Sequence, residues 1–233
     1  MYSKLTIENR SAIKRFSHSK RFKVALDILD LVEDDTLLDY GTGDGHFILS
    51  LSLKCPGVKI VGYEPIEEMF NQLVSSLKEN ESSSSVSVIQ KLESLSENSF
   101  DKITCFEVLE HLSDEMQRIA IGNIKLLLKK DGLVFISVPI EVGLSALVKN
   151  LIRFAIGQSH RGTNFLDVIK SVFGIRVKRE NAPYVNSHLG FYYFNLEKIF
   201  FEEGLIIKQK IYSPFNWLRG IINSQVFYIL SQP

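Results

Sequence analysis

A glycine-rich turn preceded by an acidic residue is the segment of this sequence with the clearest chemical potential. Gly41, Gly43 and Gly45 alternate with Thr and Asp directly after an apolar run. Glycine permits positive φ and lets a ligand approach the backbone where a Cβ would obstruct it. A turn of this kind between a strand and a helix places a ligand beside the helix N-terminus. Asp39 stands two positions before the first glycine. A carboxylate there would repel a pyrophosphate and would suit a cationic or amino-acid-bearing ligand.

A second acidic residue, Glu64, ends the next apolar run of the chain. At the end of a strand beside a glycine turn, a carboxylate can accept hydrogen bonds from both hydroxyls of a ribose.

The spacing Gly-x-Gly-x-Gly differs from the Gly-x-Gly-x-x-Gly of dinucleotide sites, which disfavours an NAD(P)-dependent oxidoreductase, one alternative function. A non-catalytic module that keeps the fold as a scaffold is the other alternative. It predicts a decayed site, whereas Asp39, Glu64 and the three glycines are all present.

Strand-like and helix-like patterns alternate along the chain and would position these residues. Apolar runs predict strands at 36–40, 58–63, 86–89, 100–106, 133–138, 205–212 and 225–231. Helical periodicity and caps predict helices near 20–32, 45–54, 65–77, 113–132, 143–156, 164–173 and 195–204. Pro65 is expected to be the first residue of its helix, Gly132 to close one, and Ser113 (or Asp114) and Asn195 to cap two others. This order predicts an α/β fold with a mostly parallel sheet and an antiparallel edge.

The length of 233 residues suits a single domain with a substantial core. We divide it into an N-terminal helical cap (1–33), a core (34–139), a helical insert (140–187) and a closing helix with a strand pair (188–233).

The amino-acid composition of the chain argues against several classes of function. The 27 Lys and Arg balance the 27 Asp and Glu, which argues against a general nucleic-acid binder. Basic residues concentrate in the segments 1–25 and 148–180. Two interpretations stay open: these residues form solvated helix faces, or they border a site for an anionic substrate or a membrane surface. The two cysteines cannot form a disulfide framework or a zinc site unaided, and no metal is expected. The polar start of the chain lacks the apolar core of a signal peptide, which predicts a cytoplasmic protein.

Four blocks of the sequence resemble the class I S-adenosylmethionine-dependent methyltransferases, in particular the type-11 group that includes ubiquinone-biosynthesis O-methyltransferases. The blocks are residues 38–45, 62–65, 99–112 and 131–139, and the segment 188–197 is similar to the family's segment before its last helix. The resemblance implies a Rossmann-like fold with a seven-stranded sheet and helices on both faces. It also implies S-adenosylmethionine as the cofactor, with residues 34–139 as a cofactor-binding core. The insert 140–187 is then expected to be the substrate-recognition insert, where the acceptor is recognised, because the family's segments before it bind the cofactor.

The resemblance assigns a set of cofactor-binding positions. They are Asp39, Gly41, Thr42, Gly43, Gly45, Glu64, Pro65, Met69, Leu92, Glu93, Phe106 and Glu107. The glycines would pass close to the methionine part of the cofactor, and Asp39 would help to orient its amino group. Glu64 would hold the ribose hydroxyls, with Pro65 and Met69 near the adenine. Lys91 stands where the family often has an acidic residue, so Leu92 or Glu93 is expected to replace that contact.

The resemblance also indicates where the reaction would take place. Phe106 and Glu107 would lie beneath the sulfonium, since an aromatic face and a carboxylate both suit a cation. Transfer of a methyl group from a sulfonium is an in-line displacement, which needs positioning, exclusion of water and, for a hydroxyl acceptor, a base. His111 and His188 are the candidate bases, although either could be a packing or surface histidine. The expected partner is a small-molecule, sugar or lipid-linked acceptor; oligomeric state stays open.

Overall fold

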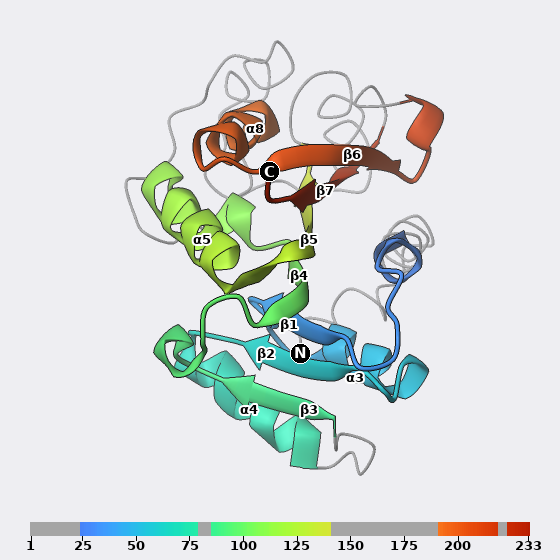
Figure 1. Ribbon diagram of the computed structural model, residues 1–233, viewed down its shortest axis with the longest axis vertical. Coiled ribbons are helices and arrows are strands. Elements are labelled where there is room, and N and C mark those ends of the chain that lie inside the picture. The colour runs from blue at the N-terminus through green and yellow to red at the C-terminus, as the bar shows by residue number, and fades with distance from the viewer. Residues whose placement is uncertain (1–23, 79–84, 141–190, 219–222) are drawn as a thin grey trace, which may run out of the picture.

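The computed structural model describes residues 24–78, 85–140, 191–218 and 223–233. Seven strands of the described chain form one sheet in the order β3-β2-β1-β4-β5-β7-β6 (Figure 1). The strands are β1 (Thr36–Tyr40), β2 (Lys59–Tyr63), β3 (Val86–Ile89), β4 (Phe100–Phe106), β5 (Leu128–Pro139), β6 (Ile206–Ser213) and β7 (Gln225–Ser231). The helices are α3 (His46–Lys54), α4 (Glu67–Lys78), α5 (Asp114–Leu127) and α8 (Tyr193–Glu202), with short 3₁₀ turns η1 (Leu92–Ser94), η2 (Leu109–His111) and η3 (Asn216–Leu218).

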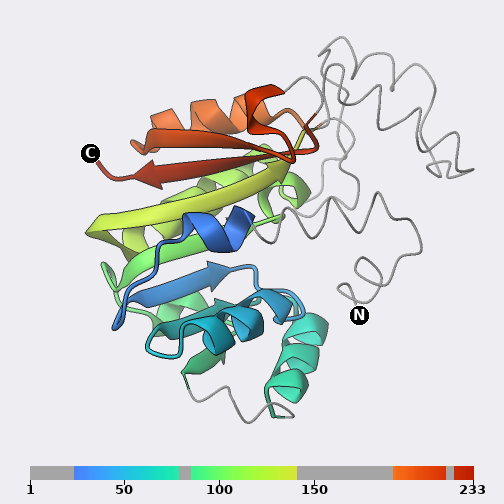
Figure 2. The same ribbon diagram turned by 90° about the vertical axis from the view of Figure 1, so that its right-hand side faces the viewer.

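The direction of the strands confirms the predicted architecture. Strands β1 to β5 are parallel, whereas β7 pairs antiparallel with both β5 and the edge strand β6. In Figure 2 the strands run across the view, and the C-terminus lies at the left, where β7 ends. The first strand, β1, lies in the middle of the sheet, next to β4. The chain leads from β1 to β2 on one side of this pair and from β4 to β5 on the other side. In open α/β sheets this switch point is where a crevice opens at the carboxyl ends of the strands.

Helices cover both faces of the sheet, as predicted. One apolar cluster joins Leu38 and Tyr40 of β1 to buried residues of α5 and α8. The other joins Leu37 of β1 to Ile48 of α3 and Leu73 of α4. Figure 1 shows α5 and α8 to the left of the sheet and α3 to its right. Alternate side chains of β1 therefore pack into two separate hydrophobic cores, one on each face of the sheet. None of the described helices is long and apolar enough to cross a membrane.

Several predicted element boundaries are wrong. Helix α4 begins at Glu67, two residues after Pro65. Helix α5 ends at Leu127, and Gly132 lies within β5 rather than at a helix end. The strand extends because Leu128 pairs with Phe100 before a shift in register. The cap of α5 is Ser113, as predicted, since its side chain accepts a hydrogen bond from the backbone N–H of Met116.

Two further differences concern the ends of helices. Asn195 lies inside the first turn of α8, whose N-cap is Tyr192. The Asn195 amide donates to Asp114 Oδ2 at 3.2 Å instead of capping its own helix. Near the N-terminus, the described helical residues are 24–28 rather than reaching 32. The predicted cap and insert lie mostly outside the described residues, so the division into these segments stays a prediction.

Candidate functional site

The glycine turn joins the carboxyl end of β1 to α3, at the switch point of the sheet. Gly41, Gly43 and Gly45 have φ values of 85°, 60° and 75°, the left-handed region that glycine alone adopts without strain. The backbone N–H groups of Gly41 and Thr42 both donate to the carbonyl of Tyr63, at 2.8 and 3.0 Å. The end of β2 therefore holds the turn in place.

The three glycines have different surroundings. A Cβ at Gly41 would lie 2.5 Å from Val108 Cγ2, and one at Gly45 would lie 2.2 Å from Leu73 Cδ1. These two glycines are needed for packing as well as for their φ. A Cβ at Gly43 would meet only Met69 Cε, at an ordinary 3.5 Å. Gly43 is thus the glycine beside which a ligand has room to approach the backbone.

Glu64 follows β2 and its carboxylate spans two loops. Its Oε2 accepts a hydrogen bond from the N–H of Gly43 and its Oε1 accepts one from Ile66, both at 2.9 Å. The residue is 3% exposed, and this burial raises the pKa of Glu64 although both hydrogen bonds act in the opposite direction. Each carboxylate oxygen has a second acceptor position. Glu64 could therefore accept bonds from two vicinal hydroxyls while keeping its backbone contacts.

Asp39 lies beneath the turn, between two threonine hydroxyls. Thr104 donates to its Oδ1 at 2.6 Å, and Thr42 donates to its Oδ2 at 2.5 Å. The side chain is buried, with 4% of the residue exposed. Desolvation raises the pKa of Asp39 to about 6, against the effect of the two hydroxyls, and the charge of Glu64 adds to the rise. This carboxylate is thus fixed in position and close to a change of protonation state at neutral pH.

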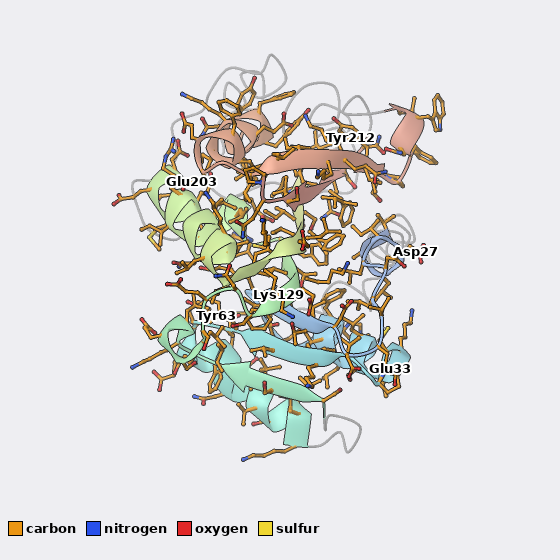
Figure 3. All side chains as sticks on the ribbon, in the orientation of Figure 1. Asp27, Glu33, Tyr63, Lys129, Glu203 and Tyr212 are labelled. Atoms are coloured by element: carbon orange, nitrogen blue, oxygen red, sulfur yellow. The ribbon has the colours of Figure 1, made fainter. Side chains whose placement is uncertain are left out.

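The residues expected near an adenine lie on both sides of the end of β2. Met69 approaches Gly43 from α4, whereas Pro65 is exposed and Leu92 is half-buried against the core. Tyr63, labelled in Figure 3, pairs with the ring of Tyr40 at 4.9 Å. Burial is the main cause that raises the pKa of Tyr63, and the charges of Glu93 and Glu64 raise it further. The Glu93 carboxylate therefore lies within electrostatic range of the Tyr63 ring.

Phe106 and Glu107 occupy the carboxyl end of β4, next to β1. The Phe106 ring meets Phe47 of α3 edge-on at 5.2 Å and Phe227 of β7 at 6.0 Å. Glu107 has a φ of 59°, which is unfavourable for a residue with a side chain. Its carboxylate accepts a short hydrogen bond from Gln225 Nε2. Backbone strain of this kind often marks a functional position.

The structure describes only one of the two candidate bases. His111 is half-buried and ends η2, four residues after Glu107 on the same side of the sheet's carboxyl edge. His188 lies outside the described residues. The structure therefore brings together the predicted residues of the glycine turn, Glu64 and Met69, and it neither supports nor contradicts catalysis by a histidine.

Two residues of this edge were missed in the sequence. Thr104 is the register partner of Asp39 and supplies one of its hydroxyls. Gln225 begins β7 and binds Glu107. Thr104 lies between Ile103 and Cys105 of β4, and Gln225 precedes Val226 of β7, so each is a polar residue beside apolar ones and is visible in the sequence. Their partners lie 65 and 118 residues away, and those contacts are set only by the order of the strands.

Comparison with known proteins gives a consistent result for the fold. Residues 8–166 match the model of a family described as a methyltransferase domain. A search of curated protein sequences finds no match.

Similar solved structures include three enzymes at 14–16% sequence identity. The cyclopropane synthase MmaA2 from Mycobacterium tuberculosis has 14% identity and a TM-score of 0.63, over 97% of this chain and 88% of that one. Magnesium protoporphyrin IX methyltransferase from Synechocystis, with bound S-adenosylhomocysteine (SAH), has 14% identity and a TM-score of 0.59, over 97% and 89%. A SAM-dependent methyltransferase from Aquifex aeolicus has 16% identity and a TM-score of 0.60, over 95% and 97%. At such low identity these likenesses show a shared fold.

Proposed function

The chain belongs to the methyltransferase-domain family, and from that premise we propose that it methylates an oxygen of a small-molecule, sugar or lipid-linked acceptor. The cofactor is S-adenosylmethionine. The observation that best supports the proposed site is the pairing of Gly43 with Glu64. A Cβ at Gly43 would meet only Met69 Cε, at an ordinary contact distance, and the Glu64 carboxylate beside Gly43 keeps two acceptor positions. A nucleoside with an amino-acid tail fits this combination.

The described residues suit the parts of that cofactor. Glu64 would accept hydrogen bonds from the ribose hydroxyls, and Gly43 would let the methionine part pass close to the backbone. Asp39, held by Thr42 and Thr104, would supply negative charge for the amino group. Phe106 would offer an aromatic face to the sulfonium. The cofactor, when bound, supplies a methyl group that is activated by its bond to a positively charged sulfur.

The protein's part in the transfer is to position, to exclude water and to accept a proton. The acceptor hydroxyl gives its proton to a base of the protein while its oxygen bonds to the methyl carbon. The cofactor held by Glu64, Gly43 and Asp39 would supply the methyl carbon and would keep the electron pair of its carbon–sulfur bond on sulfur, so charge and atoms would balance without a metal. His111 or His188 is proposed as the base.

The same proposal includes the finer assignments. The four sequence blocks support membership of the type-11 group, similar to ubiquinone-biosynthesis O-methyltransferases. We also propose a cytoplasmic location and no nucleic-acid partner, the latter supported by the balanced charge of the sequence. Peripheral membrane contact is proposed through the basic segments 1–25 and 148–180, which lie almost entirely outside the described residues.

The acceptor atom can be tested with labelled cofactor. The purified protein is incubated with S-adenosylmethionine carrying a tritiated methyl group and a solvent extract of the expression host. We expect label to enter a product that keeps it after mild alkali, because methyl ethers resist base whereas methyl esters release methanol. N-methyl amines also resist base, so the label should in addition be released as methyl iodide by hydriodic acid, which cleaves methyl ethers. Label released as methanol would show a carboxyl acceptor and contradict O-methylation of a hydroxyl. The Glu64→Ala variant, expected to bind cofactor poorly, controls for the site.

A further inference from the structure

A second polar cluster lies at the carboxyl edge of the sheet, in the half that β5, β7 and β6 form. Gln225, the first residue of β7, pairs directly with Pro139 at the end of β5 and with Ser213 at the end of β6. Directly paired residues of antiparallel strands have side chains on the same face, with Cβ atoms about 4.5–5.5 Å apart. The side chains of Gln225 and Ser213 are therefore neighbours.

Both residues carry a buried polar atom without a hydrogen-bond partner among the described residues. Gln225 is 2% exposed and Ser213 is 1% exposed. Gln225 Oε1 and Ser213 Oγ make no hydrogen bond in this part of the structure. Buried polar atoms are nearly always paired, and an unpaired one lowers the stability of the protein. Two such atoms side by side need an explanation.

The orientation of the Gln225 amide is fixed by its other contacts. Its Nε2 donates to Glu107 Oε1, and it also lies 3.1 Å from Ser137 Oγ. An ionised carboxylate only accepts hydrogen bonds, so the nitrogen must face Glu107 and the oxygen must face away from it. The unpaired Oε1 is thus a consequence of the Glu107 contact rather than of an arbitrary choice between the two amide atoms.

This cluster adjoins the proposed place of reaction. Glu107 follows Phe106 at the end of β4, between the cofactor half of the sheet and the strands that carry Gln225 and Ser213. Its N–H donates to the carbonyl of Ser137 at 3.1 Å. These contacts hold Glu107 in its strained backbone conformation, with a φ of 59°. An acceptor molecule beside Glu107 would reach towards Gln225 and Ser213.

We propose that Gln225 Oε1 and Ser213 Oγ form a subsite for hydroxyl groups of the methyl acceptor, and that this acceptor is a polyhydroxylated ring such as a sugar. This inference rests on the proposed function. Gln225 Oε1 requires a donor, and Ser213 Oγ can donate or accept, so neighbouring hydroxyls satisfy both. Neither residue is bonded to a Lys or Arg of the described chain, which makes the subsite a poor match for a carboxylate or phosphate.

Thermal unfolding of the Ser213→Ala variant gives the first test. If the hydroxyl is unpaired until a ligand binds, its removal should raise Tm by about 2–8 °C. The matched control is Ser231→Ala, at the opposite end of β7, where the hydroxyl donates to the Gln232 carbonyl at 2.8 Å. That variant should lose stability. An unchanged or lower Tm for Ser213→Ala would show that water or protein already satisfies the hydroxyl and would overturn the subsite.

Ligand-observed NMR gives the second test, with methyl α-glucoside, methyl α-mannoside and methyl α-rhamnoside as probes and SAH-saturated protein. We expect at least one glycoside to bind, and Ser213→Ala and Gln225→Met each to weaken it by about tenfold or more. For Ser213→Ala the SAH dissociation constant should stay within about twofold of the wild-type value. Equal glycoside binding by the variants, or none by the wild-type protein, would overturn the subsite. Failure of the wild-type protein to bind SAH would instead overturn the proposed function.

Discussion

At the scale of single residues, two buried carboxylates dominate the electrostatics of the site and are held differently. Glu64 is fixed by backbone N–H groups of two loops, so its position depends on the glycine turn. Asp39 is fixed by the hydroxyls of Thr42 and Thr104 and is enclosed beneath the same turn. Removal of Glu64 should therefore affect ligand contact directly, whereas the charge of Asp39 should act through its protonation state.

Replacement of Glu64 tests the ribose contact. Glu64→Ala should raise the dissociation constant of SAH by about 5- to 150-fold, the equivalent of about 1–3 kcal/mol, because two charge-assisted hydrogen bonds are lost. Isothermal titration calorimetry measures this, and Glu68→Ala, an exposed acid of the first turn of α4, is the control. An unchanged affinity in Glu64→Ala would refute the role in ribose binding.

The raised pKa of Asp39 predicts a pH dependence. The group is ionised above about pH 6 in the free protein and is neutral below it. Since the ionised form attracts the ammonium group of SAH, affinity should fall as pH is lowered through about 6 and level off above it. Fluorescence or calorimetric titration of SAH between pH 5 and pH 8 measures this. Asp39→Asn should bind weakly with a flat profile, and a flat profile for the wild-type protein would contradict the prediction.

The raised pKa of Asp39 also makes the stability of the protein depend on pH, and stability should fall over the pH range in which SAH affinity rises. The folded protein binds the Asp39 proton more tightly than the unfolded chain, whose pKa is near 3.8. The stabilisation from this proton is present below pH 3.8 and is lost as pH rises to about 6. Asp39→Asn should therefore gain stability relative to the wild-type protein at pH 7, as measured by urea unfolding, while it loses affinity for SAH. Equal stability at pH 7 would indicate that burial of the charge carries no cost.

At the scale of elements, Asp101 joins three strands at the edge of the sheet opposite the site. Its carboxylate accepts hydrogen bonds from the N–H and hydroxyl of Thr36 on β1, at 2.9 and 2.7 Å. Lys129 of β5 binds both of its oxygens, at 2.9 and 2.8 Å. Partial burial raises the pKa of Asp101, but these contacts outweigh it and hold the pKa to about 2. This residue fixes the start of β4 between its neighbours.

Asp101→Ala should lower the free energy of unfolding by about 1–3 kcal/mol, because the Thr36 donors lose their acceptor. Urea unfolding at pH 7 measures the loss. Asp131→Ala, an exposed residue of β5, should change stability by less than about 0.5 kcal/mol. The pKa of Asp101 is lowered, so its stabilisation is present above about pH 3.8 and is lost as pH falls towards 2. Equal stability of the two variants would show that the junction contributes nothing.

The elements also show what a sequence can predict. Strands β1, β3, β4 and β7 have the predicted bounds, because short apolar runs between polar turns are typical of a buried sheet. Boundaries decided by distant partners were predicted wrongly. Asn195 resembles a cap by type, but the side chain binds Asp114 of another helix. Gly132 resembles a helix end, yet pairing of Leu128 with Phe100 draws that segment into β5.

At the scale of the whole molecule, the sheet divides at its switch point into two halves, for which we propose different roles. Strands β1 and β2 carry the glycine turn and Glu64, and these were predicted because a local spacing encodes them. Strands β5, β7 and β6 carry Gln225 and Ser213, which were not predicted because their adjacency arises only from the pairing of the last two strands with β5. The proposed acceptor side of the site therefore depends on the order in which the strands pair.

A crystal structure of the protein in complex with SAH tests the central claim most directly. The account predicts both ribose hydroxyls within about 3.2 Å of the Glu64 carboxylate and the homocysteine part against the backbone of Gly43. SAH bound away from the carboxyl ends of β1 and β2, or a Glu64 carboxylate that makes no contact with the ribose, would contradict it.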